Sequence, residues 1–486
     1  MSADLHPKPL DRLLRLFTDV RAGESGSALL LTLNIFLIFV AYSIMKVLRE
    51  GLVLVAGGVD AKAASAAAQA IVLLAVVPLY GALASRVPRR RLINIVTSIF
   101  IACLGVFYAL RLLQISVGIV FYIWLGIFSV MVVAQFWGFA NDVYTTDEGK
   151  RLFPIVMFGS SSGAVIGAWL PRFIQDWIGV SQLFLLAAAL LMLSIAVSNL
   201  IDARERRRTE THLPDILTTG TMPAATGQFR AATGEFRTPQ EAYRQESGIY
   251  RAVVEPLEEE TVDEPPKSTG GAFQLVFRSR YLLLMAMLVL LLNWVNTGGE
   301  NILAAFVRDT ADRAVASGEA AGRTAEEIYN RFYSGYQGTV NAIGMLLQLF
   351  VVSRIIKYLN IPKAILLLPL VAFIGYSVIL FVPLLGAVRW AKTAENSTDY
   401  SLNNTVRQAL FLPTTREEKY KAKQVVDSFA QRAGDVLAAV TWFGGTMALG
   451  LSYTELAAVN LVLISGWLVV AVLIGRRYRR LEAVTG

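Results

Sequence analysis

Apolar residues recur along nearly the whole chain in continuous runs, and a helix needs about 20 such residues to cross a bilayer. Strands of a membrane β-barrel alternate apolar and polar residues over shorter segments, so these runs contradict a barrel. The pattern therefore predicts an all-α polytopic membrane protein with twelve transmembrane helices. Their ranges are 28–50, 62–85, 91–112, 116–143, 154–176, 181–202, 280–307, 331–356, 362–383, 386–411, 428–451 and 454–475.

Basic residues gather at one set of helix ends. They precede the first predicted helix, separate the second from the third, follow the fourth and follow the last. Because such residues mark the cytoplasmic side, both chain termini are expected in the cytoplasm. The first apolar run is longer than that of a signal peptide, so no cleaved leader is expected. The chain is predicted to reside in the inner (plasma) membrane.

A long polar connection, residues 203–279, divides the predicted helices six and six. It includes LEEETVDEPPKSTGG and a duplicated heptapeptide, AATGQFR followed by AATGEFR. Such composition buries too little apolar surface to fold, which predicts a disordered cytoplasmic linker. The expected organisation is a cytoplasmic N-terminal segment 1–27, a six-helix bundle 28–202, the linker, a second six-helix bundle 280–475 and a cytoplasmic tail 476–486.

This layout resembles the two parallel repeats of the major facilitator fold. The loop between the second and third predicted helices, GALASRVPRRR, is similar to that superfamily's loop signature. Ser85 stands where the signature usually has an acid, and Pro88 stands where it usually has a glycine. The resemblance implies the topology, but this departure weakens the loop's usual charge-relay role.

Composition agrees with a membrane protein and excludes several classes of site. The 486 residues are 17% charged, against about 25% in soluble domains, with a mean hydropathy of +0.52. The net charge of +8 comes largely from the helix flanks, so no nucleic-acid partner is expected. Cys103 is the single cysteine, and His6 and His212 lie outside the apolar runs, which excludes an intramembrane thiolate or histidine metal site. Nucleotide-hydrolysis, dinucleotide, HExxH and GxSxG motifs are absent, so neither an enzyme nor a cofactor is expected.

Ionisable side chains interrupt several apolar runs, where a charge is costly and usually functional. The first run holds Lys46, with Arg49 and Glu50 three and four residues later on the same helical face. The fourth run ends in Asn141 and Asp142. The tenth run is the most polar and carries Lys392, Glu395, Asp399 and Arg407, and the eleventh begins with Asp427, Arg432 and Asp435.

Glycines mark two further places. Gly298 and Gly299 interrupt the seventh run beside Glu300 and Asn301, which predicts a helix discontinuity lining a cavity, because lipid-exposed backbone cannot lose its hydrogen bonds. In the fifth run, glycines recur every fourth residue from Gly159 through Gly167. That small-residue stripe predicts a close approach of two helices.

Lysine and arginine beside amides and acids suit a multiply charged anion, because guanidinium forks match phosphate geometry and lysine supplies a compact charge. An alternative is that these residues pair among themselves to hold the two halves together, as Arg49 would with Glu300.

Several of these segments resemble the nucleotide-exchanging ATP/ADP translocases of intracellular bacteria and plastids. FWGFAND followed by DEGKRLFP is similar to FWGFAN and EAKRFYP of that family. KVLREGLVL is similar to RNLKDTLVV, which places Arg49 on an essential lysine, Glu50 on an aspartate and Lys46 on an arginine. Glu300 falls on an intramembrane glutamate of the family. DYSLNNTVRQALFLP and REEKYKAKQVVD are similar to further family motifs through Tyr400, Arg407, Lys421, Lys423 and Asp427.

The chain also departs from that family's pattern. Asp399 replaces a lysine, Gln408 replaces a glutamate, and Asp435 stands where a lysine or a small residue is common. The loss of cations weakens the attraction for a triphosphate. The chain is thus similar to the broad bacterial branch, for which the resemblance does not fix the substrate.

The resemblance implies a monomeric antiporter in the lipid bilayer that exchanges ATP and ADP, or takes another anionic small molecule, by alternating access. Its expected substrate-binding residues are Lys46, Arg49, Glu50, Asn141, Asp142, Glu300, Asn301, Tyr400, Arg407, Lys423 and Arg432. A first alternative is a proton-coupled transporter of another anionic metabolite or lipid headgroup, titrating at Asp142 or Glu300. A second is a non-transporting membrane sensor or scaffold that acts through the linker.

Overall fold

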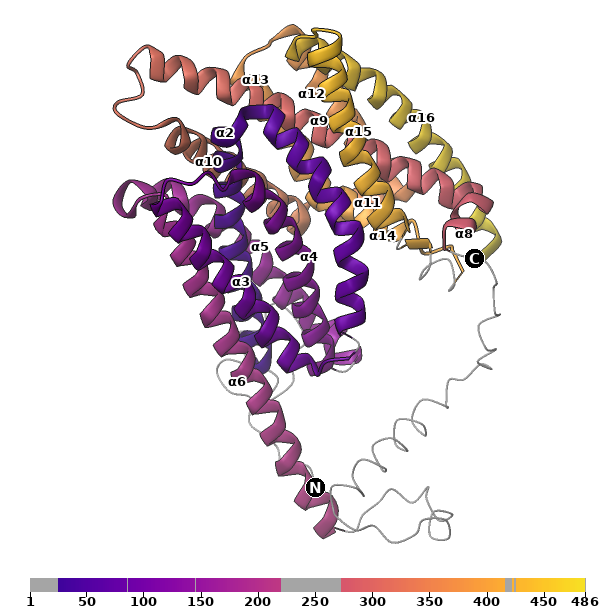
Figure 1. The fold of residues 1–486 in the computed structure, drawn as a ribbon. Coiled ribbons are helices and arrows are strands. Elements are labelled where there is room, and N and C mark those ends of the chain that lie inside the picture. Colours follow the sequence, from indigo (N-terminus) through magenta and orange to yellow (C-terminus); the bar gives the residue numbers. More distant parts are fainter. Residues whose placement is uncertain are drawn as a thin grey trace. The chain divides into compact units, whose positions relative to one another are not determined.

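The computed structural model describes residues 25–84, 86–144, 146–219, 272–415, 422–423 and 425–485, and all the regular structure in them is helical (Figure 1). The first half of the chain forms α2 (Ser25–Ala84), α3 (Arg89–Leu112), α4 (Gly118–Val143), α5 (Thr146–Ile178) and α6 (Gln182–Thr219). The second half forms α8 (Ala272–Arg278), α9 (Arg280–Ala316), α10 (Ala325–Phe350), α11 (Val352–Ala364), α12 (Leu367–Phe381), α13 (Leu385–Thr398), α14 (Asn404–Ala409), α15 (Gln431–Phe443) and α16 (Tyr453–Thr485). Three π-helical turns are η3 (Asp399–Asn403), η5 (Val425–Ala430) and η6 (Gly444–Ala448).

Seven helices of the described residues are long and apolar enough to cross a membrane, or eight if the bent pair α10 and α11 forms one span. The helix α2 counts once although it contains the first two predicted spans, which meet at a kink at Gly57 and Gly58. The tenth and eleventh predicted spans are divided by π turns into pieces too short to count. The all-α membrane fold is confirmed, whereas the number twelve and the orientation of the termini remain predictions.

Residue contacts divide the chain into two units, Ala203–Gly271 and all the rest. Residues 220–271 of the predicted linker lie outside the described part. Both ends of that linker are helical, because α6 continues to Thr219 and α8 occupies Ala272–Arg278. In α8, Val276 is buried in the apolar core and Phe273 packs edge-on against Phe429 of η5. Packing of these two side chains extends the folded second half beyond the predicted start of its bundle.

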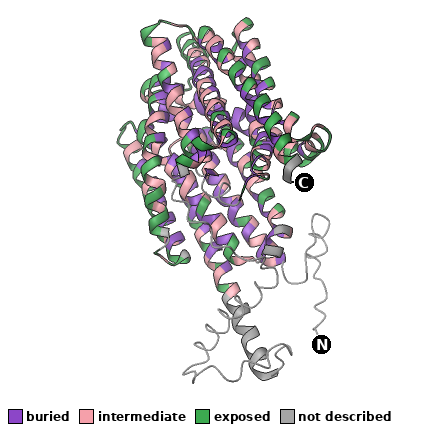
Figure 2. Ribbon diagram, turned by 90° about the vertical axis from the view of Figure 1, so that its right-hand side faces the viewer, coloured by how far each residue is buried: buried purple, intermediate pink, exposed green. Residues whose placement is uncertain are grey.

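Two apolar clusters form the core. One is confined to the first half and contains an aromatic group in which Phe121 and Phe128 are fully buried. The other fills the second half and includes Val47 and Val59 of α2, so this helix belongs to both cores. Figure 2 shows the buried positions facing inward and the exposed ones on the outside. Many outward positions are large apolar side chains, as expected for helices in lipid.

The glycine stripe lies where α5 crosses α2, and the predicted close approach is confirmed. A Cβ atom added at any of these glycines would lie only 2.5–2.6 Å from a backbone carbonyl oxygen of α2. The pairs are Gly159 with Thr32, Gly163 with Phe36, and Gly167 with Val40.

The two halves also meet along α5 and α10, over residues 164–176 and 326–341, a contact that we call the α5–α10 seam. Ser334 Oγ donates to Ala168 O at 2.6 Å and accepts from the backbone N–H of Arg172 at 3.1 Å. Asn341 donates to Ala164 O at 3.0 Å, and Arg331 forms an ion pair with Asp176. In the predicted topology this seam lies at the outer face of the membrane.

Candidate functional site

A cavity of about 240 Å³ lies between the two halves, with walls from α2, α4, α9, α10, α13, η3 and α15. Seven of the predicted site residues line it, namely Lys46, Arg49, Glu50, Glu300, Asn301, Tyr400 and Arg432. Its other charged side chains are Lys62 and Asp435. Four cations and three carboxylates therefore face the cavity, an excess of one positive charge.

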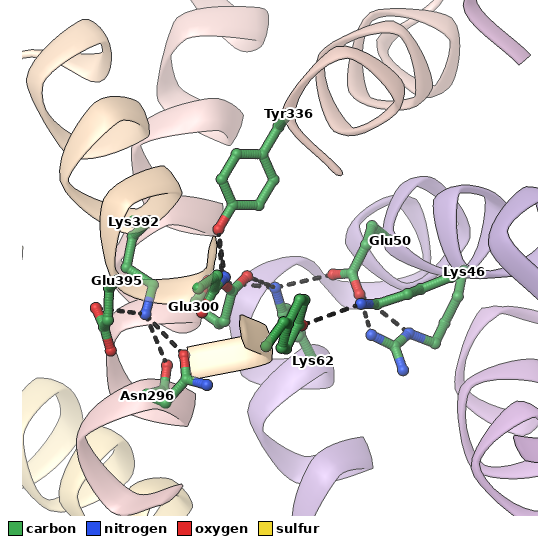
Figure 3. Close-up of polar contacts among 11 residues, drawn as sticks. Lys46, Glu50, Lys62, Asn296, Glu300, Tyr336, Lys392 and Glu395 are labelled. Atoms are coloured by element: carbon green, nitrogen blue, oxygen red, sulfur yellow. Dashed lines mark hydrogen bonds and ion pairs between the residues drawn. The ribbon is translucent and has the colours of Figure 1, made fainter. Parts of the chain in front are cut away.

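A chain of charges crosses the cavity from one half to the other (Figure 3). Glu50 of α2 accepts from Arg49 Nε at 3.0 Å, and its second oxygen lies 2.8 Å from Lys62 Nζ. Lys62 lies beyond the kink in α2 and also donates to the backbone oxygen of Glu300 on α9 at 3.2 Å, with a Glu300 carboxylate oxygen 4.0 Å away. The ring of Tyr333 lies beside the ammonium group, 5.4 Å from its centroid. One lysine thus bridges carboxylates of both halves.

Glu300 is held in place by neutral donors of the second half. Its Oε1 accepts from Tyr336 Oη at 2.9 Å and from Asn396 Nδ2 at 2.8 Å. Asn396 Nδ2 also donates to Tyr336 Oη at 2.7 Å. Because these donors occupy one carboxylate oxygen, the other remains directed toward Lys62 (Figure 3).

A second ion pair lies behind the cavity wall. Lys392 is fully buried and contacts Glu395 Oε2 at 2.9 Å and Asn296 Oδ1 at 2.8 Å. A Cβ at Gly299 would lie 3.0 Å from the Lys392 ammonium and 1.8 Å from Tyr376 Oη. The glycine admits these groups without breaking the helix. The predicted discontinuity is wrong, since α9 runs from Arg280 to Ala316 without a break.

Lys46 differs from the other cations of the cavity. Its Nζ donates to Tyr400 Oη at 3.3 Å, and among the described residues it has no carboxylate partner. Arg49, by contrast, is paired with Glu50, and its guanidinium carbon lies 4.3 Å from the centroid of the Tyr122 ring. Lys46 is therefore the cation most available to a bound anion.

Two further groups of the cavity are the cation Arg432 and the amide of Asn301. Arg432 lies 3.2 Å from Asp435, whose other oxygen accepts from Thr297 at 2.8 Å. Asn301 is 1% exposed, and within the described part of the chain neither its amide oxygen nor its amide nitrogen has a hydrogen-bond partner. A buried amide without partners is costly, so Asn301 has donor and acceptor capacity for a ligand.

Four predicted residues lie away from the cavity. Asn141 and Asp142 are exposed at the end of α4. Arg407 lies 3.8 Å from Asp427, and Lys423 donates to Gln408 at 2.6 Å. Lys421 is outside the described residues. Polar residues near helix ends need not face a central cavity, and none of these four contributes to its lining.

The pairing of Arg49 with Glu300 that the sequence suggested is replaced by two different contacts, Arg49 with Glu50 and Lys62 with Glu300. Sequence reasoning missed Lys62, which stands at the start of the second predicted run. Its surroundings, AKAASAAA, carried a usable signal, because a lysine among alanines at the edge of an apolar run needs a partner. Tyr336 and Asn396 gave no such signal.

Among the described residues, no group of three or more His, Cys, Asp or Glu side chains is placed to hold a metal ion. The charges and hydrogen-bonding groups of the cavity indicate which solutes it can bind. Within the residues that the structure describes, a cation without a carboxylate partner, a buried amide without hydrogen-bond partners and a lysine shared between two acids allow the cavity to bind an anionic, hydrogen-bonding solute.

Comparison with known proteins gives matches over most of the chain. A sequence model described as the Major Facilitator Superfamily matches residues 25–394. The "ADP,ATP carrier protein 1" of Chlamydia trachomatis is 20% identical over 63% of this chain and 54% of its own length. That of Chlamydia pneumoniae is 20% identical over 71% of this chain and 64% of its own length. The match thus spans between half and two thirds of these relatives.

Solved transporters share the fold at low sequence identity. The nucleoside transporter NupG has a TM-score of 0.56 and 11% identity, covering 94% of this chain and 99% of its own. The peptide transporter POT in complex with sulfate has a TM-score of 0.58 and 14% identity, covering 96% and 99%. The D-xylose-proton symporter has a TM-score of 0.55 and 13% identity, covering 90% and 96%. At such identities the likeness concerns the fold alone.

Proposed function

Because this chain belongs to the Major Facilitator Superfamily, whose fold it shares with membrane transporters, we propose that it carries a phosphate-bearing anion by alternating access. The specific proposal is an exchange of nucleotides of the ATP and ADP type across the inner membrane. Its main support is Lys46, a cation of the cavity between the halves that lacks a carboxylate partner. The weak similarity to ADP,ATP carriers points to the same class of solute.

In this proposal Lys46 and Arg49 meet the phosphates, with Arg432 assisting, and Asn301 and Tyr400 provide hydrogen bonds. Arg407 and Lys423 lie outside the cavity and make no direct contact with the solute in this proposal. Asn141 and Asp142 are likewise assigned to the approach to the cavity and not to its lining. Glu50 and Glu300 position the cations and, through Lys62, link substrate binding to the contact between the halves.

The size of the cavity bears on the mechanism. Its volume of about 240 Å³ is below the roughly 300–1,000 Å³ of typical small-molecule sites. A nucleotide therefore requires the halves to part further than they do in this conformation. The α5–α10 seam closes one side, which supports a cycle in which the two sides open in turn.

Counter-flow in proteoliposomes tests the exchange directly. Labelled ATP should enter vesicles loaded with ADP faster than empty vesicles. Lys46→Gln should lower that rate by about 10-fold or more, because a hydrogen bond to a charged group contributes about 1.5–3 kcal/mol. Lys357→Gln is the matched control, since Lys357 is exposed on α11 and does not line the cavity. Equal rates in loaded and empty vesicles would exclude strict nucleotide exchange.

The second candidate, proton-coupled transport of another anionic solute, is favoured by a separate observation. Lys62 is shared by Glu50 and Glu300, so protonation of Glu300 would leave the lysine to Glu50 and loosen the link between the halves. This candidate requires uptake driven by a pH gradient into vesicles that contain no substrate. Glu300→Gln should abolish that uptake, and gradient-independent uptake by the wild type would exclude the coupling.

A further inference from the structure

Two arginines from different halves converge on one glycine of the α5–α10 seam. They are Arg172 of α5 and Arg389 of α13, and the glycine is Gly335 of α10. A Cβ at Gly335 would lie 2.9 Å from Arg172 Nη1 and 3.7 Å from Arg389 Nη2. Apart from the glycine's own helix and neighbours, no other heavy atom of the described structure lies within 4 Å of that point. The two nitrogens are therefore no further apart than the sum of these distances.

Among the described residues, no carboxylate forms an ion pair with either guanidinium, and three acids of α5 and α10 have other partners. Asp176, one turn from Arg172 on α5, pairs with Arg331. Glu326 pairs with Arg111 at 2.7 Å. A Glu327 carboxylate oxygen accepts at 2.9 Å from the backbone N–H of Thr324, the N-cap residue of α10. Two guanidinium groups of the same charge thus lie close together at the seam, Arg172 exposed and Arg389 half-buried, and an anion between them would relieve their repulsion.

The chemistry of the two groups defines what such an anion would be. A guanidinium presents a planar fork of N–H donors that matches phosphate and carboxylate oxygens. An oxyanion that accepts a hydrogen bond of about 2.8 Å from each guanidinium can bridge the two nitrogens, Arg172 Nη1 and Arg389 Nη2, within the upper limit on their separation. Arg389 is also supported by the ring of Phe332, whose centroid lies 5.8 Å from its guanidinium carbon. Because Gly335 has no side chain, the Arg172 guanidinium can lie directly against the α10 backbone, on the side that Arg389 also approaches.

We propose that Arg172 and Arg389 form an oxyanion site at the α5–α10 seam that takes a phosphate group. The site is separate from the central cavity, since none of Arg172, Gly335 and Arg389 lines that cavity. A bound phosphate bridges the two halves and stabilises the closed seam. Its role as a docking point for the phosphate of the transported solute rests on the proposed function, whereas binding of free phosphate does not.

Thermal unfolding of the purified full-length protein in detergent tests the site. Inorganic phosphate should raise the midpoint by roughly 2 °C or more above sodium chloride of equal ionic strength. Arg172→Gln and Arg389→Gln should each remove that increase, and Gly335→Ala should do so with both arginines present. Arg323→Gln, at an exposed position before α10, is the matched control and should retain it. Lys46→Gln should also retain it, because it alters the central cavity alone.

Each outcome bears on the proposal. No phosphate-specific increase in the wild type would overturn it, as would an increase lost in Lys46→Gln but kept in Arg172→Gln and Arg389→Gln. ADP replaces inorganic phosphate in a second arm. An increase with ADP that Arg389→Gln removes supports docking of the solute's phosphate, and one confined to inorganic phosphate supports a site for the free ion. Failure of nucleotide counter-flow with a retained phosphate response would reject the proposed function and leave this site standing.

Discussion

Replacing Lys62 with methionine removes the positive charge that lies between Glu50 of the first half and Glu300 of the second. The lysine and Glu50 side chains are 4% and 3% exposed, and the ion pair measures 2.8 Å. At an effective dielectric constant of about 20, that distance corresponds to roughly 6 kcal/mol of gross attraction. Most of it offsets the desolvation of the two groups, and breaking a buried pair typically costs about 3–5 kcal/mol. Because Arg49 still contacts Glu50, we expect the lower end, about 3 kcal/mol.

The measurement is the free energy of unfolding in detergent for Lys62→Met, Glu50→Gln and the double variant. Glu50→Gln removes the charge that Lys62→Met leaves buried, so the double variant should be more stable than the sum of the single losses predicts. We expect a coupling of about 2 kcal/mol between the two substitutions. Additive effects, or a loss of less than about 0.5 kcal/mol in Lys62→Met, would refute the buried bridge, because surface charges behave in that way.

Three further changes test other parts of the structure. Gly163→Ala places a methyl group against the α2 backbone and should destabilise the protein by about 1–3 kcal/mol. The control Gly105→Ala should not, because a Cβ there would have nothing within 4 Å. Equal thermal midpoints of the two variants would contradict the close approach of α5 and α2. Glu395→Gln leaves a fully buried lysine without its carboxylate and should lower the midpoint far more than Glu319→Gln at an exposed site. Deleting residues 220–271 should leave the transport rate within about twofold in vesicles, since the described residues by themselves form a lined cavity. Loss of function with intact flux would favour the scaffold alternative.

Part of the candidate site follows from helical spacing. Lys46, Arg49 and Glu50 stand three and four residues apart, so a helix places them on one face, and all three line the cavity. Asn141 and Asp142 were predicted on a different ground, the cost of polar groups in an apolar run, yet they are exposed at the end of α4. Spacing along a helix shows which residues share a face, but not whether that face looks toward the other half or toward solvent.

The partners of these residues depend on contacts distant in sequence. Gly58 has a φ of 67°, in the left-handed region that favours glycine, and the kink there separates Lys62 from the helix segment that carries Glu50. Only the folded α2 shows that Lys62 contacts Glu50 across this kink. Tyr336 and Asn396 reach Glu300 from two further helices, and no pattern in either segment predicts that meeting.

The sequence by itself determined that this protein is a bundle of membrane helices, because in hydrocarbon the backbone must satisfy its own hydrogen bonds, and it placed the glycine stripe where two helices touch. The tertiary structure alone decided which charges neutralise one another and which remain available to an anion. Those properties depend on distances of a few ångströms between side chains from different helices, as at Lys46 in the cavity and at Arg172 and Arg389 beside Gly335.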